Sequence, residues 1–177
     1  MAFVKKMTVK SFMIGIALIL STTFQAFACS CKCTGDCSFS SVSNNSEFVA
    51  LIKVMSYDDY LDNEIIGHNG KMPYSMTVEI IKKFKGKETR KTIKIWGDNG
   101  AECRPYISNF KIGEHYLIAP NLLGEYKLKG EKPTDYDFFS CNTDYLKVDI
   151  DKQKAYGEYA KMKTEIGLAE FEERLKK

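Results

Sequence analysis

The sequence predicts a mainly β domain of five or six short strands that ends in an amphipathic helix. Three observations carry this prediction. Apolar and β-branched runs of strand length recur at short intervals, glycine-containing turns separate them, and residues 152–177 show a helical pattern of apolar side chains. Strand number and spacing are compatible with either a small barrel or a sandwich.

The first predicted strand, 47–56, is an almost continuous apolar and β-branched run. The second, 74–84, alternates apolar and polar residues, and the polar stretch 57–73 between them reads as a long hairpin loop. Glycine-containing turns follow the second and third predicted strands. The remaining predicted strands are 92–96, 115–119, 125–128 and 137–141.

The C-terminal stretch 152–177 is predicted to be a helix that packs on the strands. Gly157 and Gly167 weaken it by about 1 kcal/mol each relative to alanine, so two shorter helices are the alternative. The apolar stripe at i, i+4 and i+7 consists of Ala155, Tyr159, Met162, Ile166 and Ala169.

Residues 1–28 have the order of a secretory signal peptide: lysines, a nine-residue apolar run, and Ala26-Phe27-Ala28. The run is far shorter than the roughly 20 residues of a membrane span. Cleavage would leave a secreted or cell-envelope protein that begins at Cys29, with no membrane span. The expected mature chain, 29–177, has 149 residues and suits one domain.

The signal peptide carries three lysines and no acid, so the mature chain has 23 basic and 23 acidic residues. This neutral balance argues against a nucleic-acid partner. The acidic pairs Asp58-Asp59 and Asp149/Asp151 have no base or nucleophile pattern beside them, and His68 and His115 are isolated. The sequence therefore predicts no enzyme and no cofactor.

The segment 29–45 is rich in cysteine, serine and glycine and is predicted to be an extended arm with little to bury. Its cysteines either bind a soft metal such as zinc or copper(I) or form disulfides. An exported chain with an even number of cysteines favours disulfides, although six cysteines allow 15 pairings. A bridge between neighbours one residue apart would be strained, so distant partners are expected for the first two. The six are Cys29, Cys31, Cys33, Cys37, Cys103 and Cys141.

The order of these motifs resembles the N-terminal domain of the tissue inhibitors of metalloproteinases, within the netrin-like modules. The resemblance covers 29–149 and rests on a mature terminus at C-x-C, the strand Y-S-M-T-V-E-I-I-K-K-F-K-G, a cysteine after a glycine-rich turn, E-H-Y-L-I-A, and a final strand ending in Cys141. It implies a five-stranded OB-type barrel over 47–149. It also implies the pairs Cys29–Cys103 and Cys31–Cys141, which leave Cys33 and Cys37 to close their own loop.

Three features depart from that family. The sequence K-C-T-G-D-C at 32–37 replaces a segment that contains proline and histidine, and the family's third long-range disulfide has no evident partner here. The second, cysteine-rich domain of the animal inhibitors is also missing. These differences bear on potency and target choice more than on the fold.

The resemblance implies a secreted inhibitor of a zinc metalloprotease. The α-amine and carbonyl oxygen of Cys29 would chelate the zinc of the target enzyme, whose fourth position is open. Ser30 would enter the enzyme's specificity pocket, although it reads equally well as a spacer between two structural cysteines. The other implied contacts are Cys31, Lys32, Ala101 and Glu102.

Two other functions remain open from the sequence. One is a non-inhibitory netrin-like binding module of the cell envelope, including a lipoprotein acylated at Cys29. The other is a thiol-rich metal carrier. A fatty-acylated Cys29 would exclude chelation, and free thiols in 29–37 would favour the carrier.

Overall fold

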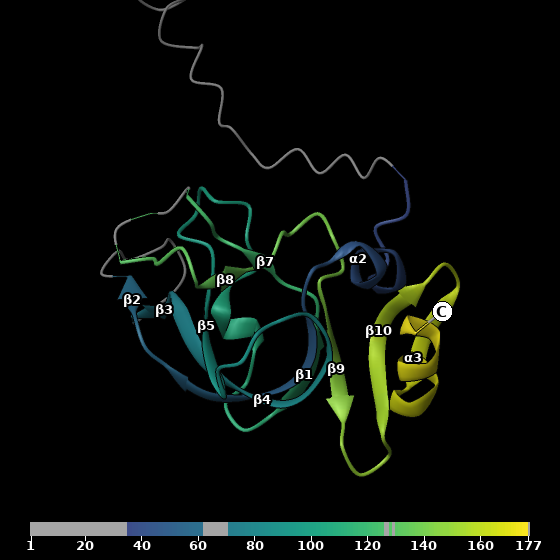
Figure 1. Cartoon of the computed structure of the whole chain (residues 1–177). Coiled ribbons are helices and arrows are strands. Elements are labelled where there is room, and N and C mark those ends of the chain that lie inside the picture. Colours follow the sequence, from purple (N-terminus) through teal and green to yellow (C-terminus); the bar gives the residue numbers. More distant parts are fainter. Residues whose placement is uncertain (1–34, 62–70, 126–127, 129, 177) are drawn as a thin grey trace, which may run out of the picture. The chain divides into compact units, whose positions relative to one another are not determined.

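The structure, a computed structural model, describes residues 35–61, 71–125, 128 and 130–176. Within these residues a nine-stranded sheet has the order β11-β10-β9-β6-β1-β4-β5-β8-β7, and a separate two-stranded sheet pairs β2 with β3 (Figure 1). In chain order the elements are α2 (Phe39–Asn45), β1 (Val49–Tyr57), β2 (Tyr60–Leu61), β3 (Met72–Pro73), β4 (Ser75–Lys85), β5 (Thr92–Trp96), the 3₁₀ helix η2 (Ile107–Asn109), β6 (His115–Ile118), β7 (Asn121–Leu122), β8 (Tyr136–Asp137), β9 (Tyr145–Asp149), β10 (Lys154–Ala160), β11 (Lys163–Gly167) and α3 (Leu168–Leu175).

The mainly β prediction is confirmed, with a large sheet and a C-terminal helix. The predicted strands 47–56, 74–84, 92–96 and 115–119 correspond closely to β1, β4, β5 and β6. β1 pairs with β4 on one side and with β6 on the other, so it lies inside the sheet. A strand buried in this way needs apolar side chains along nearly its whole length, which explains its uninterrupted apolar sequence.

Two hydrophobic cores lie on opposite faces of β1. Ala50, Ile52 and Val54 belong to one core, which β4, β5 and the 3₁₀ helix complete. Val49 and Leu51 belong to the other, which also contains side chains from β10, β11 and both helices. Alternate residues of a strand point to opposite faces, so one strand supplies both cores.

The predicted helix over 152–177 is wrong for its first half. Residues 154–167 form the hairpin β10–β11, and only 168–175 are helical. Residues four apart lie on one face of a helix but also on one face of a strand, so the spacing of Ala155 and Tyr159 fitted both structures. Gly157 decides against the helix: its φ is +137°, and a Cβ there would come within 2.7 Å of Leu146 Cδ2.

The predicted arm over 29–45 is also wrong in part, because 39–45 form α2. Phe39 is fully buried and packs against Phe171 of α3, with ring centroids 5.7 Å apart. α2 thus packs against the second core through this side chain. Its two apolar residues, Phe39 and Val42, lie one turn apart, and that signal was too sparse to predict a helix.

The predictions for three other segments also change. Of the predicted strand 125–128, Glu125 lies in a turn and 126–127 lie outside the described residues; the neighbouring strand is β7. The predicted strand 137–141 shrinks to β8, and Cys141 lies in the turn that follows. β9 was not predicted. Within the predicted loop 57–73, β2 pairs with β3.

No helix among the described residues is long and apolar enough to cross a membrane.

Candidate functional site

Most of the predicted inhibitory terminus lies outside the described residues. This applies to the signal peptide 1–28 and to Cys29, Ser30, Cys31, Lys32 and Cys33, as well as to His68. Their roles and the three disulfide pairings therefore remain predictions. Ala101, Glu102 and the other three cysteines are described.

Cys37, Cys103 and Cys141 are each disulfide-bonded, and no cysteine among the described residues is free. Two backbone hydrogen bonds bring their segments together. The Ser140 N–H donates to the Cys103 carbonyl at 2.8 Å, and the Thr143 N–H donates to the Cys37 carbonyl at 2.9 Å. Both bonds flank Cys141. We call residues 35–37, 103 and 139–143 the cysteine corner.

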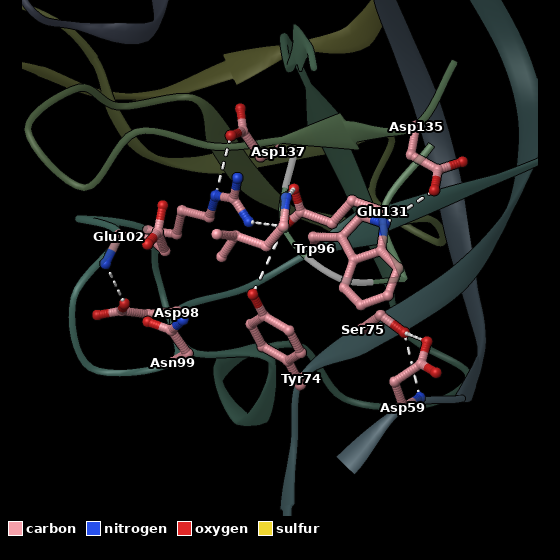
Figure 2. Close-up of polar contacts among 12 residues, drawn as sticks. Asp59, Tyr74, Ser75, Trp96, Asp98, Asn99, Glu102, Glu131, Asp135 and Asp137 are labelled. Atoms are coloured by element: carbon pink, nitrogen blue, oxygen red, sulfur yellow. Dashed lines mark hydrogen bonds and ion pairs between the residues drawn. The ribbon is translucent and has the colours of Figure 1, made fainter. Parts of the chain in front are cut away.

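The loop that leads into Cys103 is held by its own side chains (Figure 2). Asp98 Oδ1 accepts hydrogen bonds from the backbone N–H groups of Gly100 and Glu102, both at 2.9 Å. Asn99 Oδ1 accepts one from the Ala101 N–H at 3.0 Å. Three hydrogen bonds from two side chains of the loop thereby hold its backbone in place.

This loop presents the two residues that the resemblance implied as contacts. Ala101 is exposed and Glu102 is half-buried. Cys103 then adopts a φ of +56°, in the left-handed region that non-glycine residues seldom occupy. The combination of local hydrogen bonds and a disulfide-bonded, left-handed cysteine gives an exposed loop with a defined conformation.

We expect Asp98→Ala to loosen this loop without unfolding the protein. The amide protons of Gly100 and Glu102 lose their acceptor, and each should exchange about tenfold faster with solvent. Hydrogen exchange followed by NMR measures this directly. Asp151→Ala, an exposed acid in the turn after β9, is the matched control and should change neither rate.

Directly after Cys103, a buried ion cluster anchors the loop. The Arg104 guanidinium forms an ion pair with Glu131 Oε1, and its Nε lies 2.9 Å from Asp137 Oδ2. Glu131 Oε2 accepts the Leu128 N–H at 2.8 Å, so both oxygens of this fully buried carboxylate are satisfied. Figure 2 labels Glu131 and Asp137, the two acids of this cluster.

The pKa values in this cluster reflect its burial. Burial opposes the charge on Arg104, but the hydrogen bond to Glu131 and the nearby carboxylates outweigh it, so the pKa of Arg104 rises. Burial raises the pKa of Asp137, and the charge of Arg104 only partly offsets this. Burial and the charge of Glu131 raise the pKa of Tyr74 to about 12. Arg104 is therefore the cation on which the buried acids depend.

A second buried acid, Asp144, lies under the cysteine corner and is only 1% exposed. Its Oδ2 accepts the Phe139 N–H at 2.5 Å, while Oδ1 is buried without a hydrogen-bond partner in the described part of the chain. Its backbone carbonyl accepts the Ala119 N–H at 2.8 Å. Asp144 thus ties the turn that carries Cys141 to the end of β6.

The pKa of Asp144 is raised to about 6, first by burial and then by the nearby charge of Asp137, against the hydrogen bond from Phe139. The folded state therefore keeps this proton to a higher pH than the unfolded chain does. The stability that the folded state gains from binding this proton is fully present below about pH 4. It is lost as the pH rises from about 4 to about 6.

We expect Asp144→Asn to remove that pH dependence. Between pH 4 and 7.5, the free energy of unfolding of the wild type should fall by about 2 kcal/mol relative to the variant. Guanidinium chloride unfolding of the oxidised mature protein at the two pH values gives this difference, with all other titrating groups in common. Equal pH profiles for the two proteins would contradict it.

Three further residues have defined positions in the fold. Asp59 accepts hydrogen bonds from Ser75 Oγ at 2.5 Å and Lys94 Nζ at 2.9 Å. Trp96 is buried and donates its Nε1–H to Asp135 at 2.9 Å. His115 is half-buried on β6.

The described ranges contain no group of three or more histidine, cysteine or acidic residues that could hold a metal ion. The carrier hypothesis needs thiolates in 29–37, and Cys37 is disulfide-bonded. Its sulfur is therefore not available as a thiolate ligand.

The sequence pointed to Cys103 and Cys141 but not to the residues that support them. Asp98 and Asn99 stood in a D-N-G motif, which indicated a turn and nothing more. Arg104 and Asp144 carried no signal, because a buried charge looks the same in sequence as an exposed one. Comparisons with protein-family models and with curated proteins found no match.

Proposed function

We propose that this protein is an exported inhibitor of zinc metalloendopeptidases that acts through the N-terminus of its mature chain. The observation that carries the proposal is the cysteine corner. Disulfide-bonded cysteines from three separate segments meet there, beside an exposed loop with a defined conformation. A short arm that begins at Cys29 and is bonded to this corner would be held next to that loop.

The barrel implied by the resemblance is also a proposal, and the strand pairings support it. β1 pairs with β4, β4 with β5, and β5 in parallel with β8. The chain continues from β8 to β9, which pairs with β6, and β6 returns to β1. If β8 and β9 act as two halves of one strand, these pairings close an OB-type ring.

The proposed chemistry needs only the backbone of the first residue. The α-amine and the carbonyl oxygen of Cys29 are joined through one Cα, so they can close a five-membered chelate on a zinc ion and displace its water. The amine has a pKa of about 8 and must be unprotonated to coordinate, a change that the metal promotes. Disulfides at Cys29 and Cys31 would keep the arm rigid and reduce the entropy lost on binding.

The remaining contacts follow from this placement. Ser30 would direct its small hydroxyl side chain into the specificity pocket next to the zinc, and Lys32 would continue along the cleft. Ala101 and Glu102 would touch the rim of the cleft from the neighbouring loop. A rigid arm and a rigid loop on one edge together give a wedge that suits a narrow active-site cleft.

The test is inhibition of a panel of metzincin-type peptidases by the oxidised mature protein that begins at Cys29. We expect slow, tight inhibition of at least one of them. Mass analysis of the exported protein should show an unmodified N-terminal cysteine. No inhibition across the panel, or a fatty-acylated Cys29, would refute the proposal and favour a binding module or lipoprotein of the cell envelope.

A further inference from the structure

The loop before Cys103 contains an asparagine that is followed by a glycine, Asn99-Gly100. Such a pair can react within the chain, because the backbone nitrogen of the glycine can attack the side-chain carbonyl carbon of the asparagine and close a five-membered imide ring. Glycine has no Cβ to crowd this attack. Gly100 has a φ of +99°, and apart from its chain neighbours no atom of the described residues lies within 4 Å of where a Cβ would stand. The nitrogen that attacks is therefore in open surroundings.

This nitrogen is in contact with a base. The Gly100 N–H donates a hydrogen bond of 2.9 Å to the Asp98 carboxylate, a distance at which a general base can take a proton directly. The hydrogen bond lies in the plane of the peptide group, whereas the nitrogen attacks through the face of that plane. The carboxylate can therefore accept the proton while the nitrogen forms its new bond.

The carbonyl group that would be attacked is also held in place (Figure 2). Asn99 Oδ1 accepts a hydrogen bond from the Ala101 N–H at 3.0 Å. Because this hydrogen bond spans Gly100, the Asn99 side chain folds over the peptide group that contains the attacking nitrogen. The same N–H can stabilise the negative charge that develops on Oδ1 during the attack, as the donors of an oxyanion hole do. Base, nucleophile, carbonyl and oxyanion donor thus occupy four consecutive residues.

We propose that this loop modifies itself, with Asp98 as the general base and Asn99 as the residue that loses its side-chain amide. The bond between the Gly100 nitrogen and Asn99 Cγ forms, and the bond between Cγ and Nδ2 breaks. The proton of the Gly100 nitrogen passes through the Asp98 carboxylate to Nδ2, which leaves as ammonia. Water then opens the succinimide ring at either of its carbonyl groups, which gives aspartate or isoaspartate at position 99.

Both products change the loop. Either one adds a negative charge between Asp98 and Glu102, and isoaspartate also lengthens the main chain by one carbon atom. The local hydrogen bonds that define the loop would be altered with time after folding. The inference does not depend on the proposed function, but the modified loop is the one that presents the proposed contacts Ala101 and Glu102.

The experiment compares the oxidised mature protein with the same protein reduced and unfolded in guanidinium chloride, at one pH and one temperature. Proteolytic digestion and mass spectrometry follow the exchange of the amide NH₂ for OH at Asn99. We expect this exchange to be at least about tenfold faster in the folded protein, because folding brings the base and the oxyanion donor to the reacting atoms. Asn69-Gly70 is the internal standard, since both pairs should react at similar rates in the unfolded chain.

Asp98→Asn tests the base. Its side chain keeps an oxygen that can accept the N–H groups of Gly100 and Glu102, but it cannot take up the proton. We expect the exchange at Asn99 in the folded protein to slow by about tenfold or more, while the hydrogen-exchange rate of the Glu102 amide stays close to that of the wild type. Asp151→Asn, which replaces an exposed acid in the turn after β9, is the matched control and should not change the rate.

Two results would overturn the inference. If Asn99 reacts no faster in the folded protein than in the unfolded one, the loop does not promote the reaction. If Asp98→Asn reacts as fast as the wild type or faster, the hydrogen bond to Asp98 only restrains Gly100 and the carboxylate is not a base. Asn99→Gln would have to close a six-membered ring and should lose nearly all of the signal, which assigns that signal to position 99.

Discussion

A mature protein with one extra alanine before Cys29 is expected to lose inhibition of any zinc peptidase that the unextended protein inhibits, by about 100-fold or more. The extension converts the α-amine of Cys29 into an amide, whose nitrogen no longer has a lone pair for the metal. It also inserts a residue where the zinc-bound water lies. Removing one metal ligand and adding a clash would cost several kcal/mol, and each 1.4 kcal/mol is a factor of ten.

The measurement is the inhibition constant of the extended and unextended proteins against the same enzyme. Equal melting temperatures, thiol counts and hydrogen-exchange rates in the loop 98–103 would show that the extension leaves the domain intact. Ser30→Ala serves as a milder comparison, since it alters the proposed specificity contact but keeps the chelate. An extended protein that inhibits as well as the unextended one would exclude chelation by the N-terminus.

Replacing Arg104 with leucine is expected to reduce the free energy of unfolding by about 3–5 kcal/mol. Glu131, whose side chain has no exposed area, would lose the cation that compensates its charge, and Asp137 would lose its partner at 2.9 Å. An uncompensated buried carboxylate is among the most costly changes a core can receive. Denaturant unfolding of the oxidised protein measures the loss.

Two variants make this prediction specific. Glu131→Gln in the Arg104→Leu background should restore part of the lost stability, because it removes the unpaired charge. Lys82→Leu breaks an exposed ion pair with Glu172, at 2.6 Å, and should cost no more than about 1 kcal/mol. If Arg104→Leu costs as little as Lys82→Leu, the buried cluster does not support the loop.

The central strands were predictable because their burial produces a recognisable pattern of apolar residues in the local sequence. β1 is buried on both faces and is almost wholly apolar, while β4 and β5 alternate. These patterns fit a strand and no other secondary structure, so the boundaries of the three strands were predicted to within about two residues. The order of those strands in the sheet has no such pattern in the sequence, because each strand pairs with partners that are far away in the chain.

The C-terminal hairpin shows where local pattern fails. Ala155 and Tyr159 are buried as the stripe predicted, but they belong to a strand. Their spacing of four suits either period, and the decision came from the left-handed φ of Gly157 and from pairing with β9. Glycine in the sequence permitted that conformation, and only the contact with β9 required it.

The candidate site divides in the same way. The sequence by itself determined its chemical content: six cysteines, a predicted new terminus at Cys29, and a turn before Cys103. Tertiary structure decided that the segments of Cys37, Cys103 and Cys141 meet, that Arg104 and Asp144 are buried, and that Glu158 and Lys161 border the same hollow as Cys37 and Cys141. The reason is physical: residue type and spacing are local properties, whereas burial, charge pairing and proximity depend on segments that only the folded chain brings together.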